Sequence, residues 1–184
     1  DMQLHDTYFV VGHFHMMIGG VTLMATFAAI YFWFPKMFGR TMSESLGKAH
    51  FWLTFAPFFI IFFVQHFVGI EGAPRRYYSF TSYDFLRQTR GENLMMSIMA
   101  MLLISAQVIF LVNFVWSLFA GRAAASNPWQ ATTLEWTTAS PPPHGNFGSG
   151  VPSVTRWAYE YGVTDIEGDF AVQTLPEGRV PVTA

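Results

Sequence analysis

Three long apolar stretches divide the chain, and each is long enough to cross a membrane as a helix. They cover about residues 8–34, 49–70 and 94–120. Each exceeds the roughly 20 residues that a helix rising 1.5 Å per residue needs to cross about 30 Å of hydrocarbon. Backbone polar groups in lipid need partners within the protein, and the stretches lack the alternation of barrel strands. The pattern therefore predicts an all-α membrane protein with three transmembrane helices.

Proline and glycine mark the expected ends of these helices. Pro35 is predicted to end the first span, and the third should end before Gly121 and Arg122, a glycine stop followed by a cation. After residue 126 the amino-acid composition changes: proline and glycine are frequent, and there is no helical period or repeat. We therefore predict a transmembrane region in residues 1–126 and an extended, mostly irregular C-terminal tail in residues 127–184.

Composition agrees with a membrane location and limits the possible chemistry. Hydrophobic residues make up 52% of the chain and charged residues 12%, about half the usual share in a soluble domain. The net charge of −2 is too small to indicate nucleic acid as a partner, which leaves lipid as the expected surroundings. Cysteine is absent, which excludes disulfides, thiolate-held zinc, iron–sulfur clusters and cysteine-bound dinuclear copper from this chain.

The start of the chain and its loop charges leave two further points open. The first residue is Asp1, with no initiating methionine or leader before it, so we expect the latter part of a longer chain or one piece of a split polypeptide. Counting lysines and arginines slightly favours the second loop on the inner side of the membrane. Charge alone does not decide the orientation.

Two histidines, His13 and His15, lie about a turn and a half inside the first predicted span. A buried imidazole needs a hydrogen bond or a metal, so the alternatives are structural histidines and ligands. Residues i and i+2 of a helix point about 200° apart, unlike an i, i+4 pair that can bind one ion. The pair therefore predicts two centres on opposite sides of the helix with Phe14 between them, and haem iron is the natural candidate for each.

Two polar clusters are expected at one end of the spans. His5 and Asp6 suit a hard or borderline divalent ion, with Asp1 one turn earlier; the alternative is a solvated helix N-terminus. Arg75 and Arg76 follow the second span and could clamp carboxylates such as haem propionates, or meet lipid phosphates. Antiparallel neighbouring helices put both clusters on the same side of the membrane, which favours the clamp.

The order of these motifs resembles the last three helices of subunit I of the haem–copper oxidase family. The resemblance rests on His5-Asp6-Thr7-Tyr8-Phe9-Val10-Val11-Gly12-His13-Phe14-His15, Gly47-Lys48-Ala49-His50-Phe51-Trp52, Gln65-His66-Phe67-Val68-Gly69, Pro74-Arg75-Arg76-Tyr77, Leu134-Glu135-Trp136 and Ser140-Pro141-Pro142-Pro143. It covers about residues 1–147 in unbroken order. One departure is Val64, where many members have proline. The resemblance implies a larger bundle of about twelve helices, of which this chain forms part.

The resemblance also implies roles for the matched residues of the first span. His13 would be the axial ligand of the high-spin haem, where oxygen binds. His15 would bind the low-spin haem, and Phe14 would lie between the two haems, which are expected to be of the haem A type. His50 and His66, near the ends of the second span, are expected to have hydrogen-bonded structural roles.

Further roles follow for the polar clusters. The resemblance implies that His5 and Asp6 bind a magnesium or manganese ion beside the copper-bearing subunit II. Arg75 and Arg76 would pair with haem propionates, with Asp1 in the same network. This arrangement puts the second loop on the outer side, against the loop charge count, and the propionates account for the exception.

For the whole protein the resemblance implies cytochrome c oxidase activity and proton pumping. Electrons from cytochrome c would pass through the low-spin haem to a haem–copper centre that reduces oxygen to water. The copper ligands lie outside this chain, which needs the remainder of subunit I, subunit II and subunit III and is not competent alone. A bacterial cell membrane is favoured, with the mitochondrial inner membrane as the alternative. The competing hypotheses are a membrane cytochrome b-like electron carrier and a structural or assembly subunit.

Overall fold

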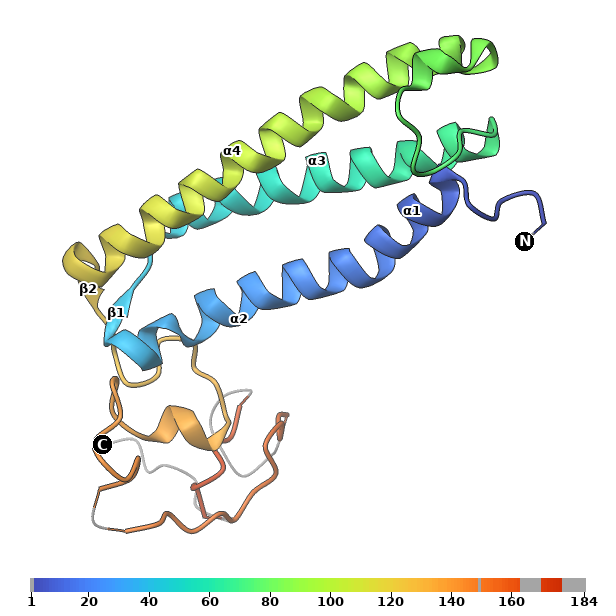
Figure 1. Cartoon of the computed structure of the whole chain (residues 1–184). Coiled ribbons are helices and arrows are strands. Elements are labelled where there is room, and N and C mark those ends of the chain that lie inside the picture. The colour runs from blue at the N-terminus through green and yellow to red at the C-terminus, as the bar shows by residue number, and fades with distance from the viewer. Residues whose placement is uncertain (1, 149, 163–169, 177–184) are drawn as a thin grey trace. The chain divides into compact units, whose positions relative to one another are not determined.

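The computed structural model describes residues 2–148, 150–162 and 170–176, and three long helical segments dominate it (Figure 1). The first segment joins α1, a π-helical turn η1 and α2; the second is α3 and the third α4. Their bounds are Tyr8–Phe14 (α1), His15–Gly19 (η1), Gly20–Phe38 (α2), Glu44–Ile70 (α3) and Arg90–Ala120 (α4). The shorter elements are β1 (Arg40–Thr41), β2 (Arg122–Ala123) and 3-10 turns at Phe80–Ser82 (η2), Asp84–Thr89 (η3) and Leu134–Thr137 (η4).

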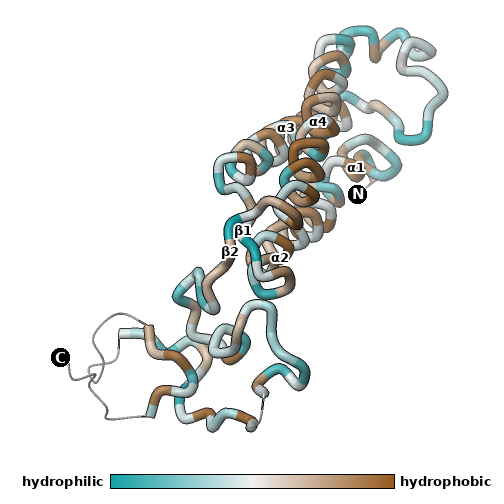
Figure 2. The backbone as a smooth tube through the Cα atoms, turned by 90° about the vertical axis from the view of Figure 1, so that its left-hand side faces the viewer, coloured by the Kyte–Doolittle hydropathy of each residue, from teal (hydrophilic) through white to brown (hydrophobic). Residues whose placement is uncertain are grey.

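The prediction of an all-α membrane protein is confirmed. Three helical segments, Tyr8–Phe38, Glu44–Ile70 and Asp84–Ala120, are long and apolar enough to span a bilayer. Within their most apolar windows, only 6%, 33% and 11% of the residues are buried by the described chain. Figure 2 shows apolar positions running along the three helices, so these faces need lipid or further helices to cover them.

The prediction that Pro35 ends the first span is wrong, because α2 continues to Phe38. A proline inside a helix removes one hydrogen-bond donor and strains the preceding turn, but membrane helices tolerate it where other groups satisfy the freed backbone. The helix ends instead at Gly39, whose φ of +67° is the left-handed conformation typical of the residue after a helix. The Gly39 N–H donates to the carbonyl of Pro35 at 2.9 Å, which closes the last turn.

The chain forms two compact units, and the first contains the described residues among 1–30 and 43–115. Within this unit α1 packs against α3 at two glycines. A Cβ atom added at Gly12 would lie 2.7 Å from the Phe62 carbonyl oxygen, and one added at Gly69 would lie 2.0 Å from the Phe9 nitrogen. Small residues allow this close approach of membrane helices.

Polar side chains join α3 to α4 in the same unit. The Asn113 amide forms a two-way pair with the backbone of Ser43: the Ser43 N–H donates to Oδ1 at 3.0 Å, and Nδ2 donates to the Ser43 carbonyl at 3.0 Å. Ser43 is the residue before α3, and its own side chain does not cap the helix. Deeper in the span, Gln107 Nε2 donates to Thr54 Oγ1 at 3.2 Å. Hydrogen bonds of this kind between helices stabilise membrane bundles.

The second unit contains the described residues among 31–42 and 116–184, and the buried side chain of Lys36 belongs to it. The Lys36 side chain is 6% exposed, and its ammonium donates to the carbonyls of Ser126 (2.9 Å), Thr138 (2.7 Å) and Ala139 (3.3 Å). The same nitrogen lies 5.0 Å from the centre of the buried Trp136 ring. One cation at the end of α2 therefore holds three backbone carbonyls that follow α4, two of them in the tail.

We expect Lys36→Met to loosen the tail. Three carbonyls would lose a charged donor, and each such hydrogen bond contributes about 2 kcal/mol. Limited proteolysis of the membrane-embedded protein should then cut more rapidly after residue 120. Lys48→Met is the control, because Lys48 is exposed and pairs with Glu44 one turn away. Equal cleavage rates in the two variants would contradict this role.

Candidate functional site

His15 lies where the first helical segment changes its winding. It begins η1, in which the Gly20 N–H donates to the His15 carbonyl five residues earlier. The His15 ring stacks on Phe62 of α3, with centroids 4.5 Å apart and planes parallel within 1°. Its Nδ1 lies 2.8 Å from the Val11 carbonyl oxygen. Since a carbonyl can only accept, Nδ1 carries a proton, and in the neutral imidazole Nε2 is then the nitrogen with the lone pair.

His13 and Phe14 occupy exposed positions beside it. The His13 ring lies edge-on to His66 of α3 with centroids 6.5 Å apart, and the Phe14 ring lies 4.3 Å from His15. The two imidazoles of the His-Phe-His motif therefore contact different residues, which are one helical turn apart on α3. Whether they serve two centres on opposite sides of the helix stays a prediction.

These histidines fit the chemistry of haem ligands. Metal-bound imidazoles usually donate their other ring N–H to a carbonyl or carboxylate, as His15 does to Val11. The exposed His13 leaves its ring open to a group held by helices beyond this chain. Among residues 2–148, 150–162 and 170–176, no three His, Asp or Glu side chains converge on one point. A shared metal would therefore take ligands from elsewhere, whereas a single axial ligand needs only one imidazole.

The structure brings His5, Asp6 and Arg75 together. Arg75 contacts the Asp6 carboxylate through Nε (2.6 Å) and Nη2 (2.5 Å), and His5 Nε2 lies 3.2 Å from the other carboxylate oxygen. The backbones join as well: the Arg75 N–H donates to the Asp6 carbonyl at 2.8 Å, and the Tyr8 N–H donates to the Ala73 carbonyl at 2.9 Å. The start of the first span is thus fastened to the loop after the second.

The hydrogen bond from Arg75 holds the pKa of the Asp6 carboxyl below its usual range. The carboxylate therefore stays charged at neutral pH, where the ion pair is complete. A lowered pKa in the folded state means that the stabilisation exists above the ordinary aspartate pKa and is lost as the pH falls through the lowered value. Acid, and not alkali, should open this contact.

The remaining predicted residues differ in how they lie. Arg76 is exposed, and its backbone is left-handed with φ of +64°. Asp1 lies outside the described residues. His66 has the hydrogen-bonded role expected for it, with Nδ1 2.7 Å from the Phe62 carbonyl oxygen. His50 is buried between the rings of Phe27 and Phe110.

Three residues of this region stand in the sequence motifs but had no role predicted for them. Tyr77 packs its ring 5.5 Å from Tyr8, and burial raises the pKa of the Tyr77 hydroxyl, which therefore stays protonated. Gly12 and Gly69 set the distance between α1 and α3. The signal for the glycines was present, because small residues within apolar spans mark close helix contacts. Tyr77 had no such signal.

We expect Asp6→Asn to loosen the junction between the first span and the second loop. The variant loses the charge that Arg75 contacts, so the Arg75 and Tyr8 amides should exchange hydrogen faster in the assembled protein. Arg76→Gln is the control, since Arg76 is exposed and the contact with the Asp6 carboxylate is made by Arg75. Unchanged exchange at both amides would show that the backbone bonds alone hold the junction.

Comparison with known proteins gave matches along most of the chain. Residues 1–102 match the family model described as cytochrome c and quinol oxidase polypeptide I. The chain is 46% identical over 178 residues to the alternative cytochrome c oxidase subunit 1 of Bradyrhizobium diazoefficiens, covering 96% of this chain and 30% of that protein. It is 42% identical to cytochrome c oxidase subunit 1 of Synechocystis over 177 residues, 95% of this chain and 31% of the relative. For the Bacillus subtilis subunit 1 the identity is 45% over 148 residues, 80% and 23% of the two chains. The chain thus spans about 30% of the length of the first relatives it matches.

Proposed function

This chain belongs to the cytochrome c and quinol oxidase polypeptide I family, and from that premise we propose that it supplies haem-binding helices to a proton-pumping terminal oxidase. The observation that carries the proposal is the pair of imidazoles at membrane depth, His13 and His15, which contact different neighbours on α3. Two imidazoles with separate surroundings suit two axial bonds better than one shared metal.

His15 is assigned to the low-spin haem and His13 to the high-spin haem. The bond from His15 Nδ1 to the Val11 carbonyl supports iron binding by His15, because it fixes the tautomer and leaves Nε2 for iron. Phe14 would separate the two groups. When bound, the haems and copper supply the electron transfer and oxygen reduction that protein side chains lack. The copper ligands would come from the remainder of subunit I.

The polar cluster at the start of the first span would bind the propionates of the haems and a divalent metal ion. Arg75 contacts Asp6 through Nε and Nη2, and the guanidinium keeps further N–H groups for a propionate carboxylate. The exposed Arg76 would bind a second carboxylate, with Asp1 in the same network. His5 and Asp6 would bind magnesium or manganese with ligands from subunit II, which is supported by the 3.2 Å contact that brings their side chains together.

The whole enzyme would oxidise cytochrome c and reduce oxygen to water. Cytochrome c is favoured as the donor because quinol oxidases of the family tend to lack the His5–Asp6 pair. Subunits II and III would complete the complex. The three relatives described above are bacterial, which supports a bacterial cell membrane as the location.

A visible spectrum of the purified complex tests the proposal. We expect two haem environments after reduction, of which one shifts on adding carbon monoxide, because only a five-coordinate haem has an open position. A single low-spin haem whose spectrum does not change on adding carbon monoxide would overturn the oxidase assignment and favour a cytochrome b-like carrier. A complex without haem would leave only a structural role.

A further inference from the structure

The tail carries three exposed aromatic residues at alternate positions, Trp157, Tyr159 and Tyr161, here called the aromatic edge. Their exposed fractions are 72%, 63% and 69%. The charged residues between and before them are turned inward: Arg156 is 5% exposed, and Glu160 is partly buried. A segment facing water normally has the opposite arrangement, with its charges outside and its aromatic rings inside.

The inward charges are satisfied within the tail. Arg156 Nε donates to the Leu175 carbonyl at 2.8 Å, and Nη1 lies 3.5 Å from the Glu160 carboxylate. Nη2 donates to the Pro176 carbonyl at 3.4 Å. Turning Arg156 outward would break these contacts, so the inverted arrangement is held by specific bonds.

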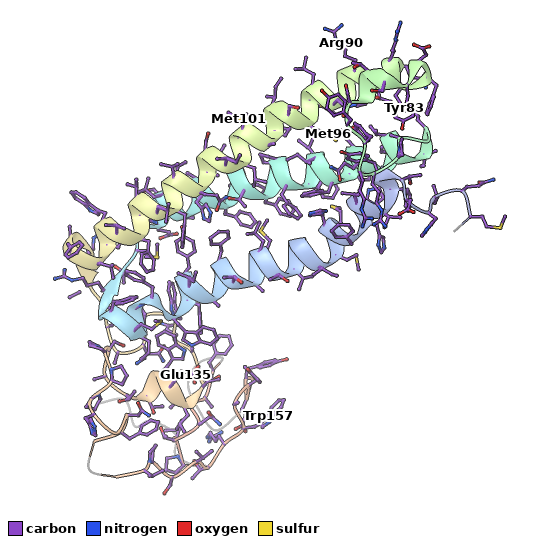
Figure 3. All side chains as sticks on the ribbon, in the orientation of Figure 1. Tyr83, Arg90, Met96, Met101, Glu135 and Trp157 are labelled. Atoms are coloured by element: carbon purple, nitrogen blue, oxygen red, sulfur yellow. The ribbon has the colours of Figure 1, made fainter. Side chains whose placement is uncertain are left out.

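Backbone contacts hold the aromatic edge in place. The Thr155 N–H donates to the Gln173 carbonyl at 2.9 Å, and the Ala171 N–H donates to the Glu160 carbonyl at 3.2 Å. Thr132 contacts both of the paired segments. Its hydroxyl donates to the Ala158 carbonyl at 2.5 Å, and its own carbonyl accepts from the Gln173 N–H at 3.1 Å. Ala158 lies between Trp157 and Tyr159, so the rings project from an anchored segment. Figure 3 shows Trp157 projecting outward from the tail.

The same unit connects this segment to the end of a membrane span. Trp129 Nε1 donates to the Phe32 carbonyl at 2.8 Å, and the Trp129 and Phe32 rings stack with centroids 6.2 Å apart. Phe32 belongs to the span Tyr8–Phe38. Trp129 precedes Thr132 by three residues, so the aromatic edge is linked to membrane level through a short ordered path.

We propose that the aromatic edge inserts into the interfacial region of the lipid bilayer at the end of α2. Tryptophan and tyrosine combine an apolar ring with one polar N–H or O–H group, which is why they gather where headgroups meet acyl chains. Within residues 156–161 the two charged side chains, Arg156 and Glu160, are turned inward, so the rings of the edge face outward without a charge between them, which favours insertion among headgroup carbonyls and upper acyl carbons. The proposal is independent of haem binding.

Spin labelling of the intact complex in lipid nanodiscs tests this proposal. The chain has no cysteine, so Trp157→Cys gives one labelling site in it. Oxygen partitions into lipid and a nickel chelate into water; at position 157 oxygen should relax the label several-fold more effectively than the chelate. His144→Cys, at an exposed polar position of the tail, is the control and should show the opposite preference.

A second variant controls for the fact that Trp157→Cys removes one ring of the aromatic edge. Tyr161→Cys keeps Trp157 and Tyr159 in place and should show the same preference for oxygen. If the chelate relaxes these labels as effectively as the label at position 144, the aromatic edge lies in water and the proposal is overturned. A label that neither reagent reaches would show that another protein covers the edge, which would also overturn it.

Discussion

Gly69→Leu is expected to prevent α1 from packing on α3 and to abolish assembly of the protein around this helix pair. A Cβ atom at position 69 would lie 2.0 Å from the Phe9 nitrogen and 2.6 Å from its Cα. These atoms belong to the backbone, which cannot turn aside as a flexible side chain could. Overpacking a tight contact commonly costs about 1–3 kcal/mol, and a clash with backbone should reach or exceed the upper end.

Thermal unfolding and yield of the purified complex measure this effect. Gly91→Ala is the matched control, because a Cβ atom there meets nothing within 4 Å. Alanine also favours a helix over glycine, so the control should keep or slightly raise the melting temperature. If the Gly69→Leu and Gly91→Ala variants have the same melting temperature, the backbones of α1 and α3 are not in contact at Gly69.

Replacing His13 and His15 separately is expected to remove two different haem signals. Under the proposed function, His13→Leu should abolish the carbon monoxide shift and oxygen consumption and leave the low-spin signal in place. His15→Leu should remove the low-spin signal, and turnover should fall to background because electrons no longer reach the oxygen site. Leucine is apolar and similar in size to histidine, so it is compatible with a position at membrane depth.

Haem content and carbon monoxide difference spectra of the two variants decide this prediction. His144→Leu, at an exposed position in the tail, is the control and should match the parent protein. Loss of the same signal in both variants would mean that the two imidazoles act on one centre. Unchanged spectra in both would remove the ligand roles altogether.

The sequence predicts the spans well but not their ends. Apolar runs report which residues can face lipid, whereas a helix continues as long as its backbone is satisfied. Glu44 and Arg90 therefore belong to α3 and α4 although they lie outside the apolar runs. Gly39 ends α2 through its positive φ, a local conformation that outweighed the proline signal.

The sequence predicted where the candidate site lies, but it did not predict which of its residues contact one another. Antiparallel helices were enough to put Asp6 and Arg75 at the same end, and their direct ion pair is present. The sequence assigned each of them to an external ligand, because no pattern reports a pairing across 69 residues. The π-helical turn that begins at His15 has no sequence signal either, and the estimate of 200° between the two imidazoles assumed regular α-helical winding.

Distance along the chain also explains why the role of Lys36 was missed. Its three carbonyl partners lie 90, 102 and 103 residues later, in a region whose composition predicts no regular structure. A lysine after an apolar span is usually an interfacial anchor, and only the fold shows that it is buried. Irregular composition therefore does not mean that a segment lacks fixed partners.

The pairing of Asn113 with Ser43 has a consequence for how the spans enter the membrane. The backbone at the start of α3 receives its partner from a side chain 70 residues further along, on a helix that is synthesised later. The Ser43 carbonyl already accepts from the Gly47 N–H of α3, so the first turn closes on its own. The bond from the Ser43 N–H to Asn113 forms only after the third span has entered the bilayer. Asn113, near the C-terminal end of α4, thus fixes the start of α3 only once both helices are in the bilayer, which makes this pair of spans a hairpin that is secured after insertion.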